Sequence, residues 1–199
     1  PVALTVSAPT VDLGRLLREA KITDLLQGTG SLTIKLTGKG GSIAAIAGSL
    51  NGGTNFLLNQ GKIKTEALDM AVGGLSAIVG MMSSEKSEWT ALNCIASRFD
   101  FKNGVATSRV LLADTEYSTV VGEGSMDLGQ EALAMKISPQ SKSATLNLAV
   151  PIKIGGTFAE PTFRPDELAT ARRSAAFWAR PRFTPAHWSP CGTLASAVV

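Results

Sequence analysis

Apolar and polar residues alternate in short runs through most of residues 92–166. The alternation is longest near the end of this block, where one side of an extended chain would carry five aliphatic residues: Leu146, Leu148, Val150, Ile152 and Ile154. A period of two is typical of a strand with one buried face and one solvated face. The block therefore predicts an antiparallel meander with a single apolar face.

Turn residues separate these runs. Asn103-Gly104 lies between two apolar-patterned stretches and suits a two-residue hairpin turn, because both residues tolerate positive φ. The polar residues 138–142 indicate a loop, and Pro161 and Pro165 are expected to end regular pairing because proline lacks an N–H donor.

Helical spacing of apolar residues occurs in three segments, 12–20, 43–50 and 66–82. In the second segment, Ile43 begins the stripe that is expected to face the sheet. We therefore predict an α+β fold, a twisted and mainly antiparallel sheet of about eight strands with two or three helices packed on it.

A glycine-rich stretch, residues 38–42, precedes the second of these helices. Glycine-rich turns before helices can bind phosphate through their free N–H groups. The stretch lacks the order of a nucleotide-binding loop, so we interpret it as a turn in which Ser42 caps the helix.

Composition places the chain among globular proteins. It has 199 residues, of which 44% are apolar and 18% charged. The formal net charge of +3 is accounted for by residues 167–199, which contain four arginines and one glutamate, so a nucleic-acid partner is not expected. We predict a domain at 1–166, followed at 167–199 by a helical start and an irregular tail that is disordered or not native to the domain.

The sequence offers no convincing catalytic or metal-binding group. Cys94 alternates with apolar residues and is expected in the core, and the single histidine, His187, lies far away in the tail. Four carboxylates near predicted turns are expected to be solvated: Asp100, Asp114, Glu116 and Glu123. We therefore expect no enzyme activity, cofactor or metal.

Four segments together resemble one known family. They are residues 32–52, then 92–106 with the sequence LNCIASRFDFKNGVA, then 122–128 (GEGSMDL) and 150–164 (VPIKIGGTFAEPTFR). In this order and spacing they are similar to the C-terminal region of the AsmA family, and the resemblance covers roughly residues 4–170.

The resemblance implies a bacterial envelope protein. Members of this family are generally tethered to the inner membrane by an N-terminal helix, with the body in the periplasm. They are related to bridge-like proteins whose sheets form a groove for lipid chains, and they are linked to outer-membrane assembly and phospholipid transport. The expected partners are therefore phospholipid, a membrane reached through an anchor upstream of this chain, and other envelope proteins.

Alternation alone selects candidate lining residues for such a groove. They are Leu111, Val121, Leu133, Met135, Leu148, Val150 and Ile152. The alternative is that the predicted helices cover the same face as an ordinary closed core, which would make the chain a structural module whose sheet edge pairs with partner or upstream strands.

Overall fold

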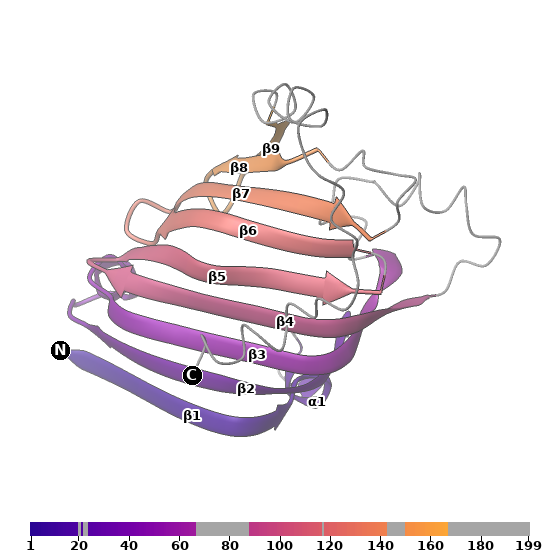
Figure 1. Cartoon of the computed structure of the whole chain (residues 1–199). Helices are drawn as coiled ribbons and strands as arrows, with labels where there is room; N and C mark the ends of the chain where they lie inside the picture. The colour runs from indigo at the N-terminus through magenta and orange to yellow at the C-terminus, as the bar shows by residue number, and fades with distance from the viewer. Residues whose placement is uncertain (20, 22–23, 67–87, 117, 143–149, 167–199) are drawn as a thin grey trace.

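The fold is one antiparallel sheet whose strands follow each other in sequence order (Figure 1). A computed structural model of the chain describes residues 1–19, 21, 24–66, 88–116, 118–142 and 150–166. In this part of the chain nine strands, β1 to β9, pair only with their sequence neighbours. The sheet is twisted and curved, with β1 along one edge and β9 along the other (Figure 1).

The first five strands are the long ones: β1 (Val2–Asp12), β2 (Leu26–Gly38), β3 (Asn51–Lys64), β4 (Trp89–Lys102) and β5 (Val105–Thr115). The remaining four shorten towards the far edge: β6 (Ser118–Asp127), β7 (Ala132–Ser141), β8 (Ile152–Gly156) and β9 (Pro161–Pro165). Two short helices lie in connections, α1 (Leu13–Glu19) between β1 and β2, and α2 (Ile43–Ala47) between β2 and β3.

The predicted α+β class is therefore wrong. The described residues form almost entirely antiparallel sheet, and α1 and α2 sit at its two ends instead of packing across it. Each helix has too few residues to present a long apolar stripe. The helical spacing of apolar residues in the sequence therefore indicated short helices in the connections between long strands. The third predicted helix, at 66–82, falls almost wholly outside the described residues.

The predicted Asn103-Gly104 hairpin is confirmed. It joins β4 to β5, and both residues have positive φ, 49° for Asn103 and 79° for Gly104. These angles suit the right-handed twist of the paired strands, which is why the dipeptide is a dependable signal.

The prolines do not end the strands as expected. Pro139 lies inside β7, opposite Val120 of β6, but β8 pairs with β7 only from Met135 to Ile137. Pro161 and Pro165 lie in β9, the edge strand. In each place the missing N–H can face an unpaired side of the sheet, so proline breaks no ladder.

The aliphatic core lies at the α1 end of the sheet. Leu13 of α1, Leu58 of β3 and Leu92 of β4 are buried together. Five partly buried residues surround them: Val11, Leu26, Phe56, Ile63 and Ile95. Helix α1 therefore closes one end of the sheet.

Candidate functional site, a charge-free sheet face

Strand register divides the side chains of the sheet into two faces, because residues paired across antiparallel strands point the same way. Leu4 pairs with Leu36, Phe56 with Ser97, and Met135 with Ile154. Following the pairs from strand to strand gives one continuous apolar face, represented on successive strands by Leu4, Ile34, Phe56, Phe99, Leu111, Val120, Met135, Ile154 and Phe163.

No charged side chain of these nine strands falls on the apolar face. Its polar residues are few, and Ser108 illustrates how they are accommodated. The Ser108 hydroxyl donates to the carbonyl of Gly124 (3.1 Å) and accepts from the Gly124 N–H (2.9 Å). A Cβ added to Gly122 would lie 2.3 Å from Leu111 Cδ2, so the leucine occupies the space that the glycine leaves. Most large side chains of this face are only partly buried.

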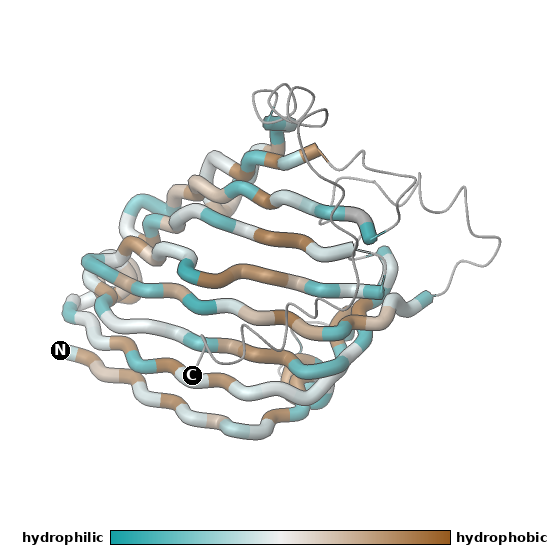
Figure 2. Tube along the Cα trace, in the orientation of Figure 1, coloured by the Kyte–Doolittle hydropathy of each residue, from teal (hydrophilic) through white to brown (hydrophobic). Residues whose placement is uncertain are grey.

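Apolar positions recur on every strand, alternating with polar ones (Figure 2). The larger part of this face has no described helix over it. Helix α1 packs at the end of the strands where β1 is connected to β2, and α2 lies beyond the opposite ends of the strands. Val2, Leu4 and Phe163 are the exposed large hydrophobic residues among the described positions of this face, and its other large side chains are partly or fully buried. The face is therefore suited to an apolar ligand.

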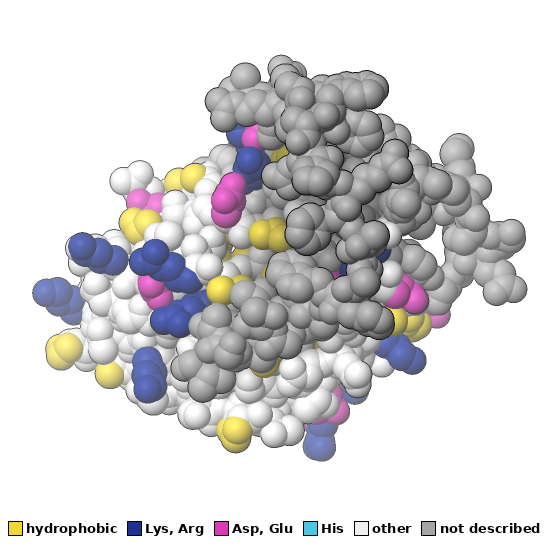
Figure 3. Space-filling view, viewed as in Figure 1, with side chains coloured by type: hydrophobic (Ala, Val, Ile, Leu, Met, Phe, Trp, Pro, Cys, Tyr) yellow, Lys and Arg dark blue, Asp and Glu magenta, His cyan; other side chains and the backbone are white. Residues whose placement is uncertain are grey.

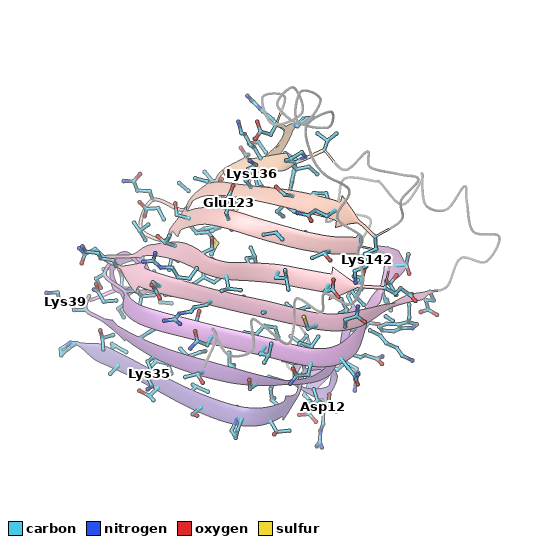
Figure 4. The ribbon with its side chains drawn as sticks, in the orientation of Figure 1. Asp12, Lys35, Lys39, Glu123, Lys136 and Lys142 are labelled. Atoms are coloured by element: carbon cyan, nitrogen blue, oxygen red, sulfur yellow. The ribbon has the colours of Figure 1, made fainter. Side chains whose placement is uncertain are left out.

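The opposite face, the charged face, carries the ionic side chains of the strands. Figure 4 labels Lys35, Glu123 and Lys136, which project from this face. Figure 3 shows the molecule in the same orientation. Lys136 Nζ lies 3.3 Å from a carboxylate oxygen of the buried Asp166, and Lys153 Nζ lies 3.0 Å from the other. These ion pairs fasten the last strands of the sheet together.

A shallow hollow of about 160 Å³ opens on the charged face. It is lined by Thr33, Lys35, Gly53, Asn55, Arg98 and Asp100. Asp100 accepts a hydrogen bond from Arg109 Nε at 2.7 Å, so the hollow is predominantly cationic.

The predicted lining residues do not all lie on one face of the sheet. Leu111, Leu133, Met135 and Ile152 lie on the apolar face, which brings them together as the alternation predicted. Val121 does not join them, because it pairs with Leu112 and Ser138 on the charged face and is 38% exposed.

The remaining two predicted residues have other positions. Val150 lies just before β8, outside any strand, and Leu148 lies outside the described residues. Val121 lies on the charged face because β6 alternates regularly, which places Val121 on the same side as Glu123 two residues later.

Sequence reasoning missed the N-terminal half of the face. Val6 and Ile34 form a cross-strand pair, and Leu32 pairs with Phe56. The alternation of residues 32–36 was visible in the sequence. Leu32, Ile34 and Leu36 share one side of this strand, which is the signal that identifies them.

Asp114 is not solvated as predicted. It is 2% exposed, and its carboxylate accepts hydrogen bonds from Asn93 Nδ2 (2.7 Å), Lys142 Nζ (2.9 Å) and the Thr119 hydroxyl. Burial acts to raise the pKa of Asp114, but the hydrogen bonds from Thr119, Lys142 and Asn93 outweigh it and hold that pKa below its ordinary value. Every donor comes from a neighbouring strand or turn, so the arrangement is structural.

Neither a metal-ligand cluster nor a membrane-spanning helix occurs among the described residues. They contain no cluster of three or more histidine, cysteine, aspartate or glutamate side chains placed to hold a metal ion. They also contain no helix with the length and apolar character needed to cross a membrane.

Comparison with known proteins settles the family. The model of the AsmA family matches residues 1–111, which run from β1 into β5. The chain belongs to the AsmA family. It is 28% identical over 160 residues to the AsmA family protein YhjG of Escherichia coli K12, a match that covers 78% of this chain and 23% of YhjG. No solved structure gives a significant match.

Membership confirms the resemblance found in the sequence. AsmA is a bacterial envelope family, which is consistent with a periplasmic or membrane-associated location of the chain. The chain spans about a quarter of the length of the curated relative that it matches.

Proposed function

We propose that this AsmA-family chain is a lipid-binding module that takes part in outer-membrane assembly or phospholipid transport. The acyl chains of a phospholipid would lie against the apolar face. The observation that carries this proposal is the absence of any charged side chain on that face of β1 to β9. Binding of this kind is not catalysis, because burying methylene groups requires no base, nucleophile or metal.

The dimensions and energies favour the proposal. Nine strands give eight spacings of about 4.8 Å, so the face extends for about 38 Å along the sheet. One leaflet of a bilayer has a hydrocarbon thickness of about 15 Å, so the face is longer than one acyl chain. Each methylene group removed from water contributes about 0.8 kcal/mol, and a chain in contact over half its length would be held without any polar contact.

The cellular location is part of the proposal. We place the module in the periplasm, tethered to the inner membrane by a segment outside this chain. The support is membership of an envelope family together with the short match to a much longer relative. Other envelope proteins are proposed as partners on the same ground.

Native mass spectrometry of the full chain, purified from an envelope fraction without detergent, tests lipid binding. Phospholipid-mass adducts are expected on the wild type. Met135→Lys should remove them, since Met135 lies on the apolar face and an unpaired charge there is costly to bury. Ala134→Lys is the matched control, because Ala134 is exposed on the charged face one residue away.

Leu4→Lys provides a second variant with little risk to folding, since Leu4 is 49% exposed on the apolar side of β1. Circular dichroism should show folded protein for all three variants. A folded wild type without adducts, or adducts that persist in both apolar-face variants, would contradict the proposal.

One observation favours the alternative of a closed interaction module. The residues of β1 from Val2 to Ala8 contain no charge, although exposed edge strands are usually protected by lysine or proline. The other edge is protected, since β9 has five residues and carries Pro161, Arg164 and Pro165. If β1 pairs with a partner strand and the face is closed, the native spectrum should show a protein–protein mass without lipid.

A further inference from the structure

The connection between β2 and β3 presents an apolar tip to solvent. Ile43, the first residue of α2, is 88% exposed, which is the highest value among the large hydrophobic residues that the structure describes. Ala44 and Ala45 are exposed beside it. The sequence predicted that Ile43 would face the sheet. It is Ile46 instead that lies against the sheet, with Cγ2 placed 3.3 Å from where a Cβ on Gly38 would be.

The tip is firmly held. Ser42 accepts a hydrogen bond from the N–H of Ala45 at 3.2 Å, which caps α2. The Ser49 hydroxyl accepts from the Lys39 N–H at 2.8 Å and lies 2.7 Å from the Lys39 carbonyl, which closes the base of the connection.

Two hairpins support the tip from behind. A Cβ on Gly104 would lie 2.6 Å from the Gly48 backbone, and a Cβ on Gly129 would lie 3.1 Å from Gly48 Cα. The turns after β4 and β6 therefore press directly on the end of α2. These contacts hold α2 in a fixed position with Ile43 in water.

The charges at this end of the sheet complement an anion. Four basic residues lie there, at the α2 ends of β2 and β4: Lys35, Lys39, Arg98 and Lys102. Figure 4 shows Lys39 at the extreme end of the sheet and Lys35 on the charged face, and Figure 3 shows Lys and Arg side chains gathered on that side.

Two acidic groups at the same end are already engaged. Asp100 is bonded to Arg109 Nε and forms a longer ion pair with Arg98 (3.9 Å), and Asp127 Oδ1 accepts from the N–H groups of Gly129 and Gln130 at 2.9 Å. Glu131 lies in the turn after β6, which also contacts Gly48, and Glu160 lies further along, in the turn after β8.

We propose that the α2 end of the sheet docks on an anionic lipid surface. Ile43 would insert between lipid headgroups, and Lys39 with its basic neighbours would lie against the phosphates. An apolar tip beside lysines is the combination that favours a membrane interface. The docking goes beyond the proposed function, because it needs no lipid on the apolar face.

Vesicle flotation of the full chain tests the docking. Vesicles of phosphatidylcholine with phosphatidylglycerol should bind the wild type, and vesicles of phosphatidylcholine alone should bind it weakly. Ile43→Asn should lower binding by about tenfold or more, because the apolar insertion is lost. Lys39→Gln should lower binding about fivefold, and only to the anionic vesicles.

Leu16→Asn is the matched control. Leu16 is 46% exposed, but it lies on α1 at the opposite end of the sheet, so its replacement should leave vesicle binding unchanged. The docking is overturned if Ile43→Asn binds as wild type, if Leu16→Asn weakens binding equally, or if both vesicle types bind equally well. Capture of a protein partner through Ile43 without vesicle binding would overturn it as well.

The two proposals can fail separately. Ile43→Asn should retain the lipid adducts in native mass spectra, since Ile43 is not on the apolar face of the strands. Met135→Lys should retain vesicle binding while it loses those adducts.

Discussion

At the scale of single residues, Asp114 shows how the sheet accommodates a buried charge. Asp114 is the next-to-last residue of β5, and its hydrogen-bond donors come from β4, from β6 and from Lys142 just beyond β7. A buried carboxylate is costly unless several donors satisfy it, and here three do. The interaction therefore joins four consecutive strands at one point.

Asp114→Asn should lower the free energy of unfolding by about 1.5–3 kcal/mol at neutral pH, as expected when hydrogen bonds to a charged group are lost. Urea denaturation measures it. Asp24→Asn is the control, because Asp24 forms an ion pair of similar length with Lys64 (2.8 Å) in an exposed position. Exposed pairs contribute little, so Asp24→Asn should change stability only slightly.

The same carboxylate should make stability depend on pH. The pKa of Asp114 is held below its ordinary value of 3.8 in the folded protein, so the unfolded chain takes up the proton more readily. The stabilisation is complete above that ordinary value and is lost as pH falls through the lower folded pKa. Wild-type stability should therefore fall more steeply with acid than that of Asp114→Asn. Parallel curves for the two proteins would contradict this explanation.

At the scale of elements, α2 is held at the end of the sheet by close contacts between glycines. Gly104 has φ of 79° and would bring a Cβ within 2.6 Å of Gly48, so it meets both a backbone and a space requirement. The contact brings together the β2–β3, β4–β5 and β6–β7 connections, which all lie at the same end of the sheet. It holds the C-terminal end of α2 against the two turns.

Gly104→Ala should therefore destabilise the protein by about 2–4 kcal/mol, combining left-handed backbone strain with overpacking. Gly41→Ala is the control, since a Cβ there would meet no atom within 4 Å. Thermal unfolding followed by circular dichroism compares the two. Equal melting temperatures would mean that the turns do not press on α2 as described.

Elements marked by local chemistry were predictable from the sequence. The Asn103-Gly104 turn and the Ser42 cap each depend on one or two residues, and both are confirmed. The face of Val121 was predictable too, because regular alternation in β6 places it on the side of Glu123. The exposure of Ile43 was not predictable, because it depends on how α2 contacts distant turns and is fixed by tertiary structure.

At the scale of the whole molecule, a single-layered sheet has two faces to account for. The α1 end is filled by the cluster around Leu58, whereas the middle of the apolar face carries no described helix. The family was predictable from ordered motifs, whereas the prediction of helices covering the sheet is wrong. Apolar periodicity does not specify whether the chain itself or a ligand covers a face.

An open apolar face predicts dye binding by the folded protein. An anilinonaphthalene sulfonate should fluoresce with the native chain at neutral pH, with near-ultraviolet circular dichroism unchanged, which distinguishes the signal from that of a molten globule. A long-chain fatty acid should displace the dye, since both compete for one surface. Leu4→Lys should weaken the fluorescence, and Thr5→Lys should not, because Thr5 is exposed on the other face of β1. A native chain that remains dark would show that the face is covered, and the lipid site would then have to lie elsewhere.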